Sequence, residues 1–170
     1  LHDLKQALPG IELKGVENHP YPIEQAMETV KKDLILCPYE KLPFKDNSFD
    51  FVVSITTLHN LYNFELDSAL REMERVGKNN KFLCVESYRN EAEKTNLLYW
   101  QVTCEAFCNP EEWDWWFMQT GYTGDHSFIY FEENMRILLM ARNPLSRWRK
   151  RCINQDLMAA TILARALWGL

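Results

Sequence analysis

An acidic residue, Glu17, ends the first segment of the chain that is typical of a β-strand, and it is a clear candidate for chemistry. Residues 11–17 alternate apolar and polar side chains before this acid. In open α/β sheets, a carboxylate at the end of a strand can accept hydrogen bonds from both ribose hydroxyls of a nucleotide. Glu17 therefore predicts a nucleotide contact, although an acid after a strand is more often a solvated loop residue.

The five cysteines favour reduced thiols over disulfides or a metal centre. Their number is odd and no Cys-x-x-Cys pair occurs. Cys37 and Cys84 lie in apolar runs typical of strands. Cys104 and Cys108 are spaced for one helix face, but no histidine or cysteine cluster completes a metal site nearby. We therefore expect no metal and a cytoplasmic setting, where thiols stay reduced.

The charge of the chain favours a small-molecule substrate or a neutral partner. The formal net charge is -5, so no global positive field attracts nucleic acid or an anionic membrane. No apolar run reaches the roughly 18–20 residues that span a bilayer, and no transmembrane segment is expected. Positive charge gathers in residues 136–170, where a solvated basic end and a surface for a separate partner are both open. The oligomeric state stays unknown.

The apolar patterns predict an α/β domain over residues 1–142, followed by a basic helical tail over residues 143–170. Strands alternate with helices, which indicates a mostly parallel sheet with right-handed crossovers. The last two strand segments flank the short turn Glu132-Glu133-Asn134 and predict an antiparallel hairpin. The expected strands are 11–17, 34–37, 51–55, 81–88, 127–131 and 135–141, and the expected helices are 22–32, 64–76, 91–107 and 110–120.

The most specific motif is the segment from Leu42 to Ser54, which reads LPFKDNSFDFVVS. This segment resembles the class I S-adenosylmethionine-dependent methyltransferases, in particular the small-molecule type 11 group, and the resemblance covers about residues 1–142. It implies a Rossmann-like methyltransferase sheet. It also implies S-adenosyl-L-methionine as the cofactor and methyl transfer to a small-molecule acceptor.

The resemblance implies cofactor-binding residues at the ends of successive strands. Glu17 matches the family position for the ribose, and Asn18 is expected beside the adenine face. Ser54 and Ile55 are expected near the methionine part of the cofactor.

The loop Cys37-Pro38-Tyr39 is expected against the adenine. Pro38 stands where the family usually has an acid, and proline offers neither a donor nor a side-chain acceptor. Tyr39 could compensate by a backbone contact or by stacking.

The family pattern after the fourth strand, SITTLHNL at residues 54–61, implies that His59 lies at the mouth of the cleft. Methyl transfer is a direct displacement, so a base is needed only for a protonated nucleophile. His59 is the best candidate base, because imidazole titrates near neutral pH. A histidine that only shapes the pocket is an equal alternative.

The Gly-x-Gly loop and first strand of this family do not occur in these residues. Residues 1–17 match what normally follows that loop, so we expect a domain truncated before it, and the activity of this chain alone stays open. The expected strand order is 3-2-(1)-4-5-7-6, with two sheet edges exposed at the missing strand. The alternative is a non-catalytic, degenerate methyltransferase-fold interaction module. A nicotinamide-dependent oxidoreductase explains Glu17 but not the segment from Leu42 or the closing hairpin.

Overall fold

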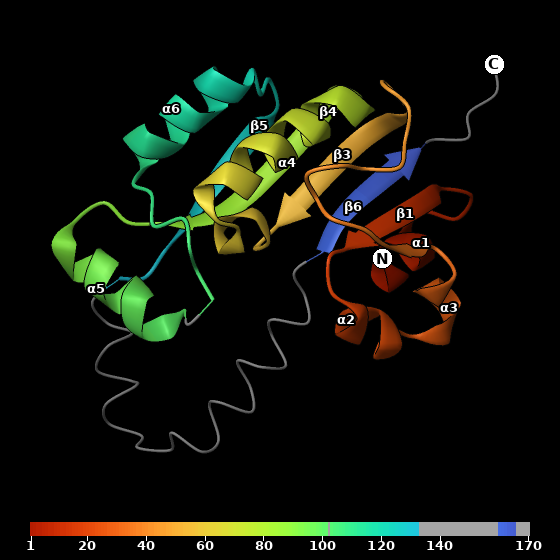
Figure 1. Cartoon of the computed structure of the whole chain (residues 1–170). Helices are drawn as coiled ribbons and strands as arrows, with labels where there is room; N and C mark the ends of the chain where they lie inside the picture. Colours follow the sequence, from red (N-terminus) through yellow and green to blue (C-terminus); the bar gives the residue numbers. More distant parts are fainter. Residues whose placement is uncertain (102, 133–159, 166–170) are drawn as a thin grey trace.

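The computed structural model describes residues 1–101, 103–132 and 160–165 (Figure 1). These residues form a six-stranded sheet in the order β2-β1-β6-β3-β4-β5. The β1–β2, β3–β4 and β4–β5 pairs are parallel, and β6 lies antiparallel between β1 and β3. The sheet is therefore a mostly parallel, Rossmann-like α/β sheet, and the predicted fold class is confirmed.

The first part of the chain builds one side of the sheet. It comprises α1 (His2–Ala7), β1 (Glu12–Glu17), α2 (Pro20–Glu24), α3 (Glu28–Lys31) and β2 (Leu34–Leu36). The single helix predicted over residues 22–32 is divided in two, because Met27 adopts an extended conformation between α2 and α3. His19 caps α2 by accepting the N–H of Tyr21.

The second part builds the other side. It comprises β3 (Phe49–Ile55), the short 3₁₀ helix η1 (Leu58–Asn60), α4 (Asn63–Val76), β4 (Gly77–Ser87), α5 (Glu91–Trp100), α6 (Pro110–Thr120) and β5 (Asp125–Tyr130). The largest differences from the predicted boundaries are that α5 ends at Trp100 and that β4 begins directly after α4. The bounds of β3, α4 and β5 differ by one or two residues.

The main core lies between β3, β4, α4 and α6. Helix α4 buries residues at helical spacing, among them Leu66, Leu70 and Met73, because its apolar side chains recur every three to four positions. Trp113 of α6 is fully buried and stacks on Phe117. These contacts hold α6 beside α4 on one face of the sheet (Figure 1).

The central place in the sheet is occupied by β6 (Ala160–Arg165), which comes from the tail (Figure 1). Ile162 pairs with Gly15 of β1 and with Val53 of β3. The predicted helix is therefore wrong for these six residues, and the sheet edges expected to be exposed are paired. A short apolar run fits a helix and a strand equally well. Here the segment forms a strand because it pairs with the edges of both β1 and β3.

The far end of the sheet also differs from the expected order. Strand β5 pairs directly with β4, in parallel, with Val85 opposite Phe128. The predicted order placed another strand between these two, and it is therefore wrong for the described strands. The second strand of the predicted hairpin, 135–141, and tail residues 143–159 lie outside the described residues.

Candidate functional site

The strand order identifies one place in the sheet where a ligand can bind. The chain moves from β1 to β2 in one direction and from β3 to β4 to β5 in the other, so the direction reverses between β1 and β3. Open α/β sheets bind ligands outside the carboxyl ends of the strands at such a reversal. Glu17 ends β1 and Ile55 ends β3, so two of the residues expected to bind the cofactor flank this point.

Glu17 is a buried acid with few polar neighbours. Its residue is only 6% exposed, and the Tyr39 hydroxyl donates to Glu17 Oε2 at 3.4 Å. Burial raises the pKa of Glu17 to about 7, and the hydrogen bond from Tyr39 opposes part of that rise. The carboxyl group is therefore poised to gain or lose a proton near neutral pH.

Tyr39 joins the loop after β2 to the end of β1. The tyrosine is buried, and burial together with the nearby Glu17 raises the pKa of its hydroxyl, which stays protonated. The backbone N–H of Cys37 also donates to the carbonyl of Glu17 at 2.9 Å. The structure thus brings Glu17 and Tyr39 together, while Asn18 and Pro38 lie exposed beside them.

The end of β3 carries Ser54 and Ile55 and a strained residue that the sequence did not reveal. Ser54 is fully buried, and Ile55 is 43% exposed at the edge of the sheet. Thr56, the next residue, has a φ of 53°, a left-handed conformation that is rare for a β-branched side chain. Such strain gathers at functional sites, and no sequence pattern signals it.

Two strand spacings separate the ends of β1 and β3. Val16 and Ser54 both pair with Thr161 of β6, one from each side. Neighbouring strands lie about 4.8 Å apart, so these backbones are about 10 Å apart. Glu17 and Ile55 therefore end two parallel strands on either side of β6, at the same edge of the sheet.

His59 lies in the core and not at the mouth of a cleft, so the expected placement is wrong. Its residue is 0% exposed, and burial lowers the pKa of its imidazole to about 4. The backbone N–H of Glu86 donates to Nδ1 at 3.3 Å, which assigns the proton to Nε2, 3.4 Å from Glu86 Oε2. The neutral ring therefore joins η1 to β4 in the core.

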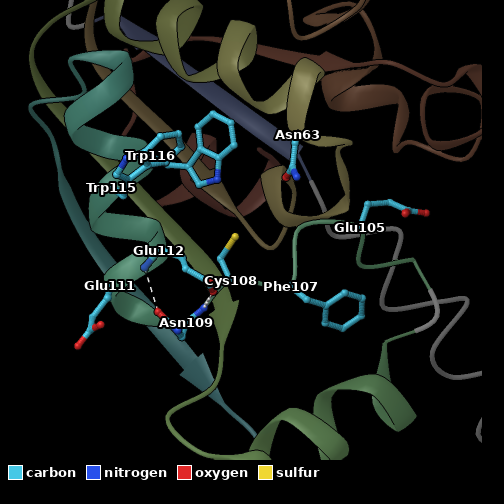
Figure 2. Close-up of a pocket in the computed structure, with 9 residues that line it drawn as sticks. All are labelled: Asn63, Glu105, Phe107, Cys108, Asn109, Glu111, Glu112, Trp115 and Trp116. Carbon is cyan, nitrogen blue, oxygen red and sulfur yellow. Dashed lines mark hydrogen bonds between the residues drawn. The ribbon is translucent and has the colours of Figure 1, made fainter.

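A cavity of about 730 Å³ opens at the same edge of the sheet, beside the amino end of α6 (Figure 2). The loop that forms its wall is fixed to η1, because the N–H groups of Glu105 and Ala106 donate to the carbonyl of His59. Its lining is mixed in character: Asn63, Glu105, Phe107, Cys108, Asn109, Glu111, Glu112, Trp115 and Trp116.

The aromatic side chains of α6 form two groups. Trp113 and Phe117 belong to the core, whereas Trp115 and Trp116 line the cavity and meet edge to face at 5.0 Å. Cys108 borders the cavity, and burial followed by the charge of Glu112 raises the pKa of its thiol to about 11. The thiol is therefore neutral, and the cavity offers apolar and acidic contacts.

Comparison with known families connects this geometry to one class of enzymes. Residues 3–85 match the family described as a methyltransferase domain. This match supports a class I S-adenosylmethionine-dependent methyltransferase of the type 11 group. The matched segment runs from α1 into β4 and includes Glu17, Tyr39, Ser54 and His59. No curated protein and no solved structure matches the chain.

Among the described residues, only one side of the reversal point carries a buried acid. Glu17 and Tyr39 form a buried acceptor at the end of β1, which suits the ribose hydroxyls of the cofactor. On the other side, antiparallel β6 ends with Arg165 opposite Glu12, away from Glu17. In the described part of the chain, no helix follows the central strand at the edge of Glu17 to present N–H groups to a carboxylate. The residues therefore fit the nucleoside of the cofactor and not its amino-acid end.

Two further findings concern only the described residues. Within them, no helix has the length and apolar character needed to cross a membrane. No group of three or more histidine, cysteine, aspartate or glutamate side chains gathers there as a metal site.

Proposed function

We propose that the chain binds the nucleoside part of S-adenosyl-L-methionine at the end of β1 and serves methyl transfer to a small-molecule acceptor. The observation that carries this proposal is the burial of Glu17 at the reversal point of the sheet. A buried carboxyl group with a raised pKa at the reversal point of an open sheet is a functional-site signal, because burying an acid is unfavourable unless it has a role. Ribose hydroxyls are suitable partners, since they donate to a carboxylate.

The bound cofactor would supply an electrophilic sulfonium methyl group, so the protein has to bind and align. Glu17 accepts the ribose hydroxyls, and Tyr39 holds the carboxyl group in place. Ile55 gives an apolar surface on the other side of β6. Asn18 and Pro38, exposed beside Glu17, are proposed to face the adenine, and the buried Ser54 supports the end of β3 from within.

The acceptor is proposed to bind in the cavity beside α6 (Figure 2). This cavity lies beyond the end of β3, because η1 and the start of α4 lead from that strand end to Asn63. Its two tryptophans supply apolar contact area, and its volume matches that of a small-molecule site. His59, whose carbonyl anchors the cavity wall, is proposed as a positioning residue and not as the base.

The test is a calorimetric titration of the chain with S-adenosylhomocysteine. We expect measurable binding by the wild type and a loss of at least about tenfold in Glu17→Gln, since a bond to a charged group contributes about 1.5–3 kcal/mol. Glu12→Gln, at the other end of the same strand, is the matched control and should bind as the wild type does. Equal affinities for wild type and Glu17→Gln would contradict the role of Glu17.

A second candidate is a non-catalytic module that keeps the methyltransferase fold and binds another macromolecule. The antiparallel direction of β6 favours it, because the central strand then offers no N-terminal helix end to the cofactor. The same titration separates the two candidates. Absence of binding by the folded wild type would reject the cofactor proposal and favour the module.

A further inference from the structure

We propose that the space between β1 and β3 is a binding slot for an extended peptide strand, which the segment Ala160–Arg165 fills within the same chain. The slot accepts the same sequence when it is supplied on a separate peptide. This proposal is independent of cofactor binding, because it concerns the backbone edges of two strands. Its occupant also pairs with Val16, the residue before Glu17.

The two sides of the slot come from separate parts of the chain. One side is the β1–β2 pair with α1 to α3, and the other is the β3–β4–β5 sheet with α4 and α6 (Figure 1). β6 separates them and forms five residue pairs with each neighbour. Both open edges would present unpaired N–H and C=O groups, which is the pattern that binds an added strand.

The strands that border the slot are inner strands of a core. Leu13 and Val16 of β1 and Val52 of β3 are at most 1% exposed. Val16 and Val52 belong to the main core cluster, together with buried residues of α4. The strands on both sides of the slot are thus anchored to the core, and their edges offer main-chain groups to an incoming strand.

The connection of β6 to the rest of the sheet is long. β5 ends at Tyr130 on the edge of the sheet and β6 begins at Ala160 in its centre. A strand of the same chain competes with a separate one through its local concentration, so the same strand supplied separately should bind at sufficient concentration.

The test uses the full chain carrying Ile162→Pro, which removes an N–H from the middle of β6 and disfavours a central strand. A fluorescent peptide of residues 158–167, with two added lysines for solubility, is titrated into this variant and followed by fluorescence anisotropy. The matched control peptide carries proline at the position of Ile162. The wild-type chain, whose slot is already filled, is the second control.

We expect the peptide to bind the variant at least about tenfold more tightly than it binds the wild type, because the local concentration of the tail protects the wild-type slot. The proline peptide should bind neither chain. Equal binding to variant and wild type, binding of the proline peptide, or no binding at all would overturn the proposal.

If the variant aggregates, a refolding measurement replaces the titration. The variant is then refolded with and without each peptide, and the yield of soluble monomer is measured by size-exclusion chromatography. Recovery with the unmodified peptide only is expected. Failure of that peptide to increase the yield would equally overturn the proposal.

Discussion

Replacement of Glu17 with glutamine should stabilise the protein at alkaline pH and leave its stability nearly unchanged in acid. Burial raises the pKa of Glu17 from 4.5 to about 7. The contribution of this group to stability is then fully present below its unfolded pKa and is lost as pH rises through 7. Each pKa unit corresponds to about 1.4 kcal/mol, so ionised Glu17 costs roughly 3 kcal/mol above pH 8.

The assay is urea unfolding followed by tryptophan fluorescence at about pH 5 and about pH 8.5. The wild type should lose about 2.5 kcal/mol more stability than Glu17→Gln between these values, because the effect is already partly present at pH 5. Glu12→Gln, an exposed acid of the same strand, should keep the wild-type pH dependence. If Glu17→Gln shows the wild-type pH dependence as well, the carboxyl group is not held in the buried state described here.

The same ionisation should appear in ligand binding. Ribose hydroxyls donate to the charged carboxylate, so a bound nucleoside lowers the pKa of Glu17 and releases protons near pH 7. Calorimetry with S-adenosylhomocysteine in two buffers of different ionisation enthalpy measures this release. Binding that weakens as pH rises through 7 would refute the proposed contact.

Three further substitutions test the fold and the edge of the site. Trp113→Ala should destabilise the protein by about 3–5 kcal/mol in urea unfolding, because the buried ring leaves a cavity; an equal effect of Trp115→Ala, at the exposed cavity wall, would contradict this. Asn90→Ala should cost about 1 kcal/mol by the same assay, because Asn90 accepts the N–H of Glu93 at the start of α5; a neutral result would count against that cap. Thr56→Gly should raise the melting temperature, because relief of a positive φ is worth about 1 kcal/mol; a lower value would mean that Thr56 is not strained.

The sequence predicts those elements whose apolar pattern matches a single structure. Helix α4 has regular apolar spacing, and its expected start at residue 64 differs by one position from Asn63. The continuous apolar run at the end of β3 is equally clear. Helix α5 is shorter than predicted, and its buried residues, Glu93, Asn96 and Leu97, are mostly polar. β6 was missed because its strand form depends on edges more than a hundred residues away.

The site shows the same division between local and distant causes. The position of Glu17 could be predicted, since the alternation of residues 11–17 predicts a strand that ends at this acid. Its pKa could not, because the burial depends on tertiary packing and on Tyr39. The predicted position of His59 was wrong because a motif gives the order of residues along the chain and not the direction of a side chain. Glu86, whose N–H donates to the His59 ring, follows 27 residues later.

Occupancy of the central slot and ionisation of Glu17 are physically linked. Glu17 follows Val16, which pairs with Thr161 of β6, so β6 covers the strand that ends in this acid. Without β6, water would reach the end of β1, and hydration would lower the pKa of Glu17 towards its ordinary value. Conversely, protonation of Glu17 removes the cost of burying a charge there and favours the filled slot. The strand that closes the sheet and the acid proposed to hold the ribose therefore depend on each other.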